Sequence, residues 1–424
     1  MRICVFEDHA VTRLQPLTDT RPAFDLRSGA RTLLERQLHA FGVEQAFAFV
    51  RPELADLCRL GHPELTVNNL CGRRDETIIF VNARWLPLAN PPRPLEGGEV
   101  GLCNGQPAYV SLPAGELDPL QAGKVLGQLE EWTEKLPVRP AAGRMIAYPW
   151  DLIEHHAEAL EQDYLHWNRR GTTAQAAGVS VVGPAERCLV HPSARVEPLT
   201  LIDTTRGAVL IDRDAVVQAF SRVEGPCYIG PGTQVLGAKL RGASLGPQCR
   251  IGGEVEATII QGYSNKAHDG FLGHSYLGEW VNLGAGTQVS DLRTDYATVC
   301  VNMGGNSVDT GLLKVGAFIG DHTKTSISAQ VNTGSVFGPF DQLLTSGSFL
   351  PRSLPAFCRF GRGEIHERSD LREIFASATL AMARRSQEWT EAHAEFYFEL
   401  YDRTAASRRQ QMRESEQRRL RRAV

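Results

Sequence analysis

The 424-residue sequence has few of the features expected of an exported, membrane-bound or metal-rich protein. Met1 to Val11 contain no basic segment followed by an apolar one, and no run of about 18 apolar residues occurs. The nine cysteines are scattered and form no CxxC pair, which predicts reduced, mostly buried thiols and no zinc site. We therefore expect a cytoplasmic protein with no membrane partner.

The sequence also has little net charge. The 45 lysines and arginines nearly balance the 49 acidic residues, which leaves a formal charge of −4. Because there is no basic field to attract a long polyanion, we expect no nucleic-acid partner. The basic run at the C-terminus, SRRQQMRESEQRRLRRAV, is expected to be a solvated helix end, since Glu414 and Glu416 lie among its arginines.

What the sequence does have is a six-residue repeat between Val181 and Ser348, with units such as IGPGTQ, LGPQCR and LGAGTQ. Each unit fits a short strand and a tight turn, in which glycine takes backbone values that a β-carbon disfavours. Three units close one turn of a parallel β-helix, and stacked turns bury one aliphatic column. The residues expected to point inward are Val190, Val223, Ile229, Leu245, Ile251, Leu277, Leu283 and Ile319.

This repeat resembles that of the hexapeptide-repeat acyltransferases. The resemblance implies that the β-helix is left-handed, which the repeat alone does not show. An alternative interpretation is that the helix serves only as a trimerisation rod, because a fold does not determine a function.

The N-terminal part predicts an α/β layer, with strands at Arg2–Phe6, 42–50 and 77–81 and a helix at 32–40. Its opening run, FEDHAVTRLQPLTDTRPAFDLRSG, resembles the start of the sugar-phosphate nucleotidylyltransferases, whose loop reads roughly LAGGxGTRLxPLTxxRPK and lies against the nucleotide phosphates. The matching residues are Thr12, Arg13, Leu14, Pro16, Leu17, Thr18, Arg21 and Pro22.

The same run departs from the family at several positions that the family uses for its reaction. Asp8, His9 and Val11 replace glycines, Ala23 replaces a lysine, and Ala83-Arg84 replaces the Gly-Asp expected to hold magnesium. An acidic side chain at position 8 would repel a triphosphate unless a metal ion such as Mg²⁺ intervened. If a nucleoside triphosphate binds, the resemblance places Thr12, Arg13 and Arg21 against it, since a guanidinium offers two parallel donors. Alternatively, the two arginines pair with Asp19 and Asp25.

Residues 149–170 predict a helix that joins this domain to the repeats, and 171–178 predict a linker. We therefore expect three domains, at 1–178, 179–350 and 351–424. The last is expected to be helical from Glu364 and to cap the final coil. The predicted fold class is an α/β nucleotidyltransferase-like, Rossmann-like domain, then a left-handed parallel β-helix, then a C-terminal helix.

The repeat is interrupted at 200–209, 261–270 and 291–309, and loops that leave a rigid solenoid often carry function. The run from the second interruption through FLGHSYLGEWVNLGAGT resembles the bifunctional enzymes that make UDP-N-acetylglucosamine from glucosamine 1-phosphate. The resemblance places the catalytic histidine at His268 and the active-site asparagine at Asn282. It places the bend beside acetyl-CoA at Gly284, Ala285 and Thr287.

A histidine suits acetyl transfer because an amino-sugar ammonium must lose a proton before it attacks a thioester. An imidazole with a reference pKa of about 6.5 can accept that proton at neutral pH. We expect His268 to be the general base, with Asp269 as a candidate to orient it, and His274 to be the alternative base.

The expected substrate is a sugar phosphate. Phe271 stands where the family has a tyrosine, and the family's phosphate-gripping positions fall on Ala238 and Glu256. Other basic residues nearby could replace them. The expected substrate-binding residues are Lys239, Arg241, Lys266 and Phe271.

Further along, Lys324 is expected to meet a phosphate of CoA, and the resemblance implies a homotrimer with sites between chains. The predicted function is therefore acetyl transfer from acetyl-CoA to an amino sugar phosphate. Two alternatives stay open: nucleotidyl transfer alone, with the β-helix as a trimer scaffold, and a binding protein without catalysis.

Overall fold

The structure is a computed structural model that describes residues 1–69, 76–88, 95, 97–113, 125–167, 178–345 and 349–422. The chain forms two compact units. The first comprises Met1–Leu14, Thr20–Leu26 and Arg31–Tyr148, and the second comprises Gln15–Asp19, Arg27–Ala30 and Pro149–Val424. The expected linker at 171–178 lies outside the described residues except for Gly178.

The first unit is built on a seven-stranded sheet with the order β10-β8-β9-β6-β1-β4-β5. The central β1 pairs in parallel with β4 and β6, and β9 runs antiparallel to both β6 and β8. The central strands are apolar and buried on both sides, as a sheet covered on both faces requires. The strands are β1 (Arg2–Phe6), β4 (Ala46–Phe49), β5 (Thr66–Val67), β6 (Ile78–Asn82), β8 (Glu99–Cys103), β9 (Gln106–Leu112) and β10 (Val138–Pro140).

Short helices accompany this sheet. α1 (Leu33–Phe41) begins at a capping box, in which Thr32 and Glu35 each accept a hydrogen bond from the other's backbone N–H, and it ends at Gly42 in the left-handed conformation. The other helices of the unit are η1 (His9–Leu14), η2 (Ala23–Asp25), η3 (Pro52–Leu54), α2 (Ala55–Gly61) and α3 (Val125–Lys135), and a small two-stranded sheet joins β7 (Trp85–Leu86) to β11 (Arg144–Met145).

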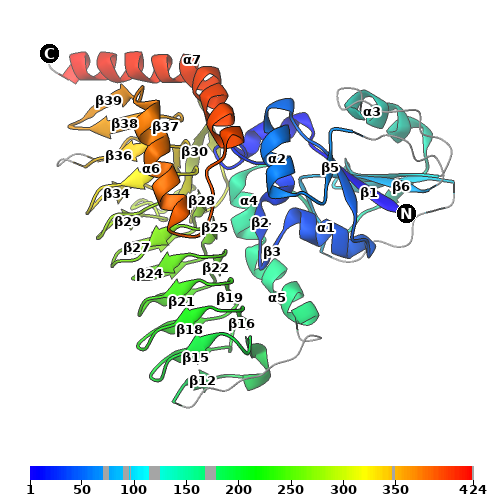
Figure 1. Cartoon of the computed structure of the whole chain (residues 1–424), viewed down its shortest axis with the longest axis horizontal. Helices are drawn as coiled ribbons and strands as arrows, with labels where there is room; N and C mark the ends of the chain where they lie inside the picture. The colour runs from blue at the N-terminus through cyan, green and yellow to red at the C-terminus, as the bar shows by residue number, and fades with distance from the viewer. Residues whose placement is uncertain are drawn as a thin grey trace. The chain divides into compact units, whose positions relative to one another are not determined.

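The second unit contains a parallel β-helix whose short strands stack in three faces (Figure 1). Face 1 holds β12 (Ser180–Val182), β15 (Leu201–Asp203), β18 (Arg222–Glu224), β21 (Lys239–Arg241), β24 (Glu254–Glu256), β27 (Phe271–Gly273), β29 (Gln288–Val289) and β34 (Gln330–Val331). Face 2 holds β13 (Cys188–Val190), β16 (Val209–Ile211), β19 (Cys227–Ile229), β22 (Ser244–Leu245), β25 (Ile259–Gly262), β28 (Tyr276–Glu279), β32 (Ala317–Ile319), β35 (Ser335–Phe337) and β37 (Ser353–Leu354). Face 3 holds β14 (Arg195–Val196), β17 (Val216–Val217), β20 (Gln234–Val235), β23 (Arg250–Ile251), β26 (Asn265–Lys266), β33 (Lys324–Thr325), β36 (Gln342–Leu343) and β38 (Cys358–Gly361), and isolated bridges through Asn282 join its two halves.

The inner column of the β-helix confirms the prediction of which repeat residues point inward. All eight residues expected to point inward are buried, and seven of them belong to strands that stack in register from coil to coil. Glycine is required where two coils approach closely. A β-carbon on Gly246 would lie only 1.9 Å from the carbonyl oxygen of Gln261 in the next coil.

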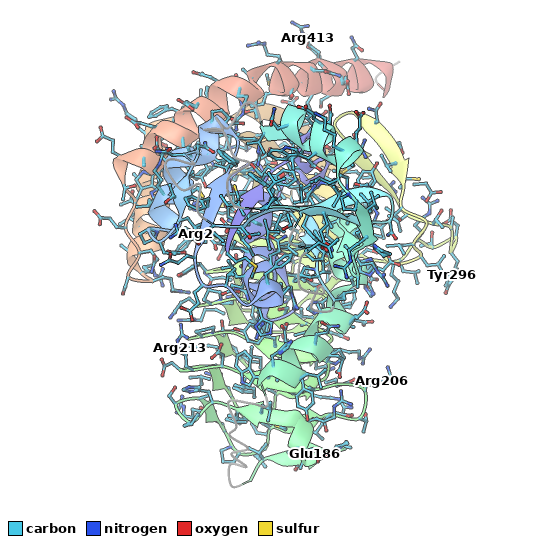
Figure 2. The ribbon with its side chains drawn as sticks, turned by 90° about the vertical axis from the view of Figure 1, so that its right-hand side faces the viewer. Arg2, Glu186, Arg206, Arg213, Tyr296 and Arg413 are labelled. Carbon is cyan, nitrogen blue, oxygen red and sulfur yellow. The ribbon has the colours of Figure 1, made fainter. Side chains whose placement is uncertain are left out.

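One long excursion leaves the β-helix after Ser290 and returns before β32. It contains the antiparallel hairpin of β30 (Cys300–Met303) and β31 (Asn306–Asp309). At its base Leu292 bridges to Lys314, and at its outer part Tyr296 is 70% exposed (Figure 2). The excursion corresponds to the third interruption seen in the sequence.

Segments from earlier in the chain pack on face 2. β2 (Arg27–Ser28) donates its Arg27 N–H to the Tyr276 hydroxyl at 2.7 Å and to the Gln261 side chain at 3.1 Å. α4 (Pro149–Glu154) and α5 (His156–Trp167) belong to the same unit, and Asp163 accepts a hydrogen bond from Ala30 N–H at 2.7 Å. The remaining short elements are β3 (Arg31–Thr32) and η6 (Ala185–Arg187).

The chain ends in two helices, α6 (Leu371–Ala383) and α7 (Glu391–Arg422), which lie against the last coils (Figure 1). The expectation of continuous helix from Glu364 is wrong at its start. Glu364–Glu367 form β39, which turns back through Arg362 and Gly363 and pairs antiparallel with β38, so its backbone groups bond to a strand instead of to a helical turn.

The fold class is the predicted one: an α/β domain, a left-handed parallel β-helix and C-terminal helices. Within the described ranges, no helix combines the length and the apolarity needed to cross a membrane.

Candidate functional site

His268 lies at the corner where the chain passes from face 3 to face 1. Its exposed side chain lines a hollow of about 580 Å³ that spans several successive coils. The other lining residues are small or apolar, apart from Asp269 and Ser328. They are Leu236, Gly253, Ala267, Asp269, Ala285, Gly286, Ile327 and Ser328.

The Lys266 side chain lies inside this corner, at a position where other coils carry an aliphatic residue. Its Nζ donates hydrogen bonds to the carbonyl oxygens of Gly252 at 2.9 Å and His268 at 2.7 Å, and only 2% of the residue is exposed. Burial lowers its pKa from 10.5 to about 8, against a smaller opposing effect of Asp269. The ammonium group therefore supports the loop that carries His268, whereas the sequence suggested contact with substrate.

The residues expected near acetyl-CoA divide into two groups. Ala285 lines the hollow together with His268. Gly284 and Thr287 form the turn beneath it: the Thr287 hydroxyl donates to the Gly284 carbonyl at 2.7 Å, and Gly284 N–H donates to the Thr325 hydroxyl at 2.8 Å. A β-carbon on Gly284 would meet the backbone of Ser326 at 2.5 Å, so the turn requires glycine there.

Asn282 and Lys324 lie next to each other on face 3 instead of in the hollow. The Lys324 Nζ donates to the Ser377 hydroxyl of α6 at 2.8 Å, and burial, followed by the charge of Arg368, lowers the pKa of Lys324. Asn282 lies beside Asn265, whose side-chain oxygen accepts a hydrogen bond from Arg385 at 3.0 Å. Ser377 of α6 and Arg385, which follows α6, therefore contact residues of face 3.

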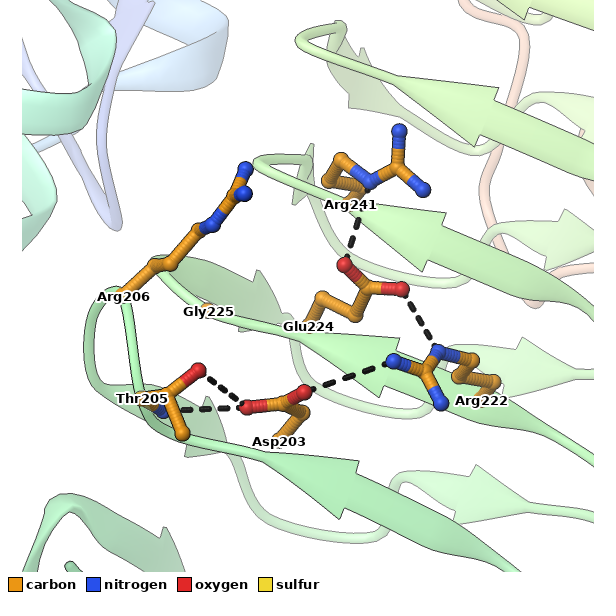
Figure 3. A pocket seen from close by; sticks show the side chains of 7 residues that line it. All are labelled: Asp203, Thr205, Arg206, Arg222, Glu224, Gly225 and Arg241. Carbon is orange, nitrogen blue, oxygen red and sulfur yellow. Dashed lines mark hydrogen bonds and ion pairs between the residues drawn. The ribbon is translucent and has the colours of Figure 1, made fainter. Parts of the chain in front are cut away.

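Lys239 and Arg241 lie on the outer side of face 1, in a ladder of alternating charges. Arg241 pairs with Glu224 at 3.1 Å and with Glu256 at 3.4 Å. Below it, Arg222 joins Glu224 to Asp203 (Figure 3). A polar hollow of about 340 Å³ opens here, lined by Asp203, Thr205, Arg206, Arg222, Glu224, Gly225 and Arg241. The Arg241 guanidinium is thus already paired with two carboxylates.

Phe271 is the first residue of β27, and His274 directly follows the last residue of this strand. A β-carbon on Gly273 would meet the Phe271 ring at 2.6 Å, so that ring lies over Gly273. His274 Nδ1 lies 2.7 Å from Asp291 Oδ2. The sequence named His274 as the alternative base but did not identify Asp291 as its partner. The only available signal was that Asp291 begins an interruption of the repeat.

In the first unit, Asp8 is bonded to Arg84, which replaces a magnesium ligand of the related family. The Arg84 guanidinium lies 2.6 Å and 2.8 Å from the two Asp8 carboxylate oxygens, and Asn82 donates to Asp8 at 2.9 Å. Burial raises the pKa of Asp8, but the bonds and charge of Arg84 outweigh it, and the pKa is lowered. Because the Arg84 guanidinium already bonds both oxygens of the Asp8 carboxylate, the side chains at this position do not fit a Mg²⁺ ion. Across the described ranges, no cluster of three His, Cys, Asp or Glu residues could hold a metal ion.

The residues expected to bind nucleotide lie near the start of the chain. Thr12 and Arg13 are exposed on η1, and the Thr12 hydroxyl donates to the His9 carbonyl at 3.0 Å. Arg21 is half-buried just before η2, and its carbonyl accepts a hydrogen bond from Arg51 at 3.3 Å. Arg13 therefore remains accessible to an anionic ligand.

Comparison with known proteins agrees with both resemblances at the level of family. Residues 3–170 match the family model described as sugar nucleotidyl transferase. The chain is 35% identical over 150 residues to a bifunctional sugar-1-phosphate nucleotidylyltransferase/acetyltransferase of Sulfurisphaera tokodaii, a match that covers 32% of this chain and 35% of the relative. It is 26% identical over 307 residues to a bifunctional protein GlmU of Cyanothece sp., which covers 65% of this chain and 56% of the relative.

The matches leave much of each relative's length uncovered. The chain spans about a third of the Sulfurisphaera tokodaii protein and little more than half of the Cyanothece one. Among solved structures, the polySia specific acetyltransferase NeuO is similar at 12% identity and a TM-score of 0.20, covering 49% of this chain and 94% of NeuO. A likeness this weak carries no argument about function.

Proposed function

We propose that this chain, whose residues 3–170 match the sugar nucleotidyl transferase family, transfers an acetyl group from acetyl-CoA to an amino sugar phosphate at the His268 hollow. The observation that supports this most directly is the meeting of an exposed imidazole with the small residues Ala285 and Gly286 along one groove. A relative named as a bifunctional sugar-1-phosphate nucleotidylyltransferase/acetyltransferase adds support.

The chemistry assigns one role to each part of the hollow. The His268 imidazole accepts a proton from the sugar ammonium, and the free amine attacks the carbonyl carbon of the thioester. As the C–S bond breaks, the nitrogen loses its second proton to solvent, and the CoA thiolate takes up the proton held by the imidazolium. Lys266 acts as a positioning residue, because it bonds the carbonyl oxygen of His268 from inside the coil.

The direct test is release of CoA from acetyl-CoA in the presence of glucosamine 1-phosphate. We expect His268→Ala to lower kcat by about 10²- to 10⁴-fold, the usual contribution of a general base. His191→Gln is a control, because His191 is a half-buried histidine of a different coil turn, whose ring is bonded to neighbouring Ser193. Wild-type activity in His268→Ala would overturn the assignment of the base, and no CoA release from wild type would overturn the reaction.

A second candidate function is nucleotidyl transfer by the first unit, which the family match of residues 3–170 favours. Its test is pyrophosphate release from UTP or dTTP with a hexose 1-phosphate, compared between wild type and Arg13→Ala. If neither CoA nor pyrophosphate is released, the chain acts as a scaffold or binding protein.

A further inference from the structure

The first interruption of the repeat, at 200–209, borders a polar hollow that the proposed function does not use. The corner between β15 and β16 has five residues, 204–208, whereas each of the next three corners between faces 1 and 2 has two. The longer loop brings Arg206 to the hollow of about 340 Å³ on the outer side of face 1 (Figure 3). A hollow of this volume suits a small ligand.

The two carboxylates of the hollow already accept a hydrogen bond at each of their oxygens. Asp203 Oδ1 accepts from the Thr205 hydroxyl at 2.6 Å, and Asp203 Oδ2 accepts from Arg222 Nη2 at 3.3 Å. Glu224 Oε1 accepts from Arg222 Nε at 2.6 Å, and Glu224 Oε2 accepts from Arg241 Nε at 3.1 Å. The Asp203 and Glu224 side chains are only 17% and 16% exposed. These carboxylates therefore hold the guanidinium groups in place and offer little to a ligand.

The guanidinium groups keep donors that are not bonded within the described part of the chain. Arg222 uses its Nε and Nη2, and Arg241 uses its Nε and Nη1, so Arg222 Nη1 and Arg241 Nη2 remain. Among the residues that the structure describes, none bonds the Arg206 guanidinium, which extends toward Arg241 (Figure 3). What the hollow still offers is N–H donors, so its ligand must supply acceptors.

The loop that carries Arg206 is held on both sides. Toward the preceding coil, the Thr204 hydroxyl donates to the Pro184 carbonyl at 2.8 Å. Toward the next coil, Gly207 packs so closely that a β-carbon on it would lie 2.4 Å from the backbone nitrogen of Pro226. The Arg206 side chain therefore starts from a fixed backbone, which reduces the freedom lost when a ligand binds.

The charges of the hollow favour an anion. At neutral pH its three guanidinium groups and two carboxylates leave one positive charge. Guanidinium groups bind phosphate oxygens through paired, charge-assisted hydrogen bonds. The described lining residues include no aliphatic or aromatic side chain, so they offer nothing to an apolar group. A phosphate carried by a hydroxylated molecule therefore fits the hollow, and an apolar anion does not.

We propose that the hollow binds the phosphate group of a small hydroxylated phosphate ester, between Arg206 on one side and Arg222 and Arg241 on the other. The site is separate from the one at His268, because the two hollows share no lining residue and lie at opposite edges of face 1. Its carboxylates are already bonded, so no described lining residue is free to act as a base. The ligand is therefore bound as an effector and does not react there.

The direct test is isothermal titration of the whole protein with glucose 1-phosphate and with inorganic phosphate, with glucose as the uncharged control. We expect both phosphates to bind, the ester more tightly, and glucose not to bind at this site. Arg206→Gln should weaken the binding of the ester at least about tenfold, because it removes a charge-assisted donor. Equal isotherms for wild type and Arg206→Gln would overturn the inference, and binding of inorganic phosphate alone would overturn the assignment to an ester.

Two further variants serve as controls. Arg213→Gln removes an arginine that is likewise exposed at a corner of the β-helix, and Arg13→Ala changes the candidate nucleotide site of the first unit. Both should keep the binding event that Arg206→Gln loses. Since Arg206 is exposed and bonds no described residue, Arg206→Gln should keep the wild-type Tm without ligand. Equal loss of binding in Arg213→Gln would reveal a general effect of charge and would count against the site.

CoA release distinguishes this site from that of the acetyl acceptor. The inference does not depend on acetyl transfer, because it concerns binding alone. If Arg206→Gln raises the KM for glucosamine 1-phosphate, the hollow holds the phosphate of the acceptor and the inference of a separate site is wrong. If wild type releases no CoA but Arg206→Gln loses binding of the ester, the proposed function fails and the site stands.

Discussion

Lys266 shows how one buried side chain can serve a neighbouring residue at a cost in stability. Its ammonium group fills an inward position of the β-helix and bonds two carbonyl oxygens, one of them that of His268. A pKa lowered from 10.5 to about 8 corresponds to about 3 kcal/mol of destabilisation by the buried charge. The benefit is a fixed loop conformation at the proposed active site.

This residue makes a prediction about pH. The destabilisation is fully present below about pH 8, where Lys266 is charged in both states, and disappears as the pH rises to 10.5, because the folded state loses its proton first. The free energy of unfolding of wild type should therefore rise by up to about 3 kcal/mol relative to Lys266→Met over this range. Denaturant unfolding at several pH values measures it, with exposed Lys239→Met as control. Parallel curves for Lys266→Met and wild type would contradict the pKa.

Arg84 makes a prediction about the first unit. Its side chain is 3% exposed and is bonded to Asp8, so Arg84→Met would leave the partly buried Asp8 carboxylate without its only cationic partner among the described residues. We expect a loss of about 3–5 kcal/mol in the free energy of unfolding at neutral pH. The loss should shrink as the pH falls through the lowered pKa of Asp8, since a protonated carboxyl no longer needs the guanidinium.

The control for Arg84→Met is Arg59→Met, which breaks an exposed pair with Asp56. An exposed ion pair contributes at most about 1 kcal/mol, so the control should unfold almost as wild type does. Equal effects of the two substitutions would show that the Arg84 pair is not the buried contact described.

At the scale of elements, α7 stabilises the β-helix by covering a column of stacked rings. Tyr263, Trp280, His322 and Phe340 occupy successive corners with positive φ, and the ring centroids of His322 and Phe340 are 4.5 Å apart. From α7, the Tyr397 ring meets Phe340 edge-on at 4.9 Å. The helix thus caps an aromatic surface that the last coils would otherwise expose.

Tyr397→Ala should therefore destabilise the second unit. Tyr397 is 4% exposed, and loss of its ring should cost about 3–5 kcal/mol and lower the Tm measured by calorimetry. The neighbouring Phe398 is 46% exposed, so Phe398→Ala should cost less than Tyr397→Ala. If both variants melt together, α7 does not act as a cap through its buried face.

At the scale of the whole molecule, the prediction is a homotrimer, as the resemblance to hexapeptide-repeat enzymes implies. Light scattering coupled to size-exclusion chromatography should give three times the 46.6 kDa mass of one chain. A proposed site completed by a neighbouring chain would also lose specific activity on dilution below the dissociation constant. A mass of one chain at working concentration would contradict the prediction.

Much of the architecture could be predicted from the sequence because its signals are local. An aliphatic residue and a glycine in each six-residue unit determine which side chains enter the inner column, whatever the neighbouring coil contains. The same holds for the turn at Gly284 to Thr287, whose glycines are needed for close approach of the next coil. Sequence resemblance also indicated His268 and Ala285, which line one hollow.

The partners of charged and catalytic side chains were decided by the tertiary structure alone. Cys188 pairs with Val209 but Val209 pairs with Cys227, so the coils differ in length and a fixed period cannot tell which residues come to lie side by side. Asp8 meets Arg84 because both follow neighbouring parallel strands of one sheet, and Asp291 meets His274 because both follow strands that stack in register in successive coils. The sequence determined the inward-facing residues because each six-residue unit marks its own inward position, whereas these pairs required the packing of separate segments.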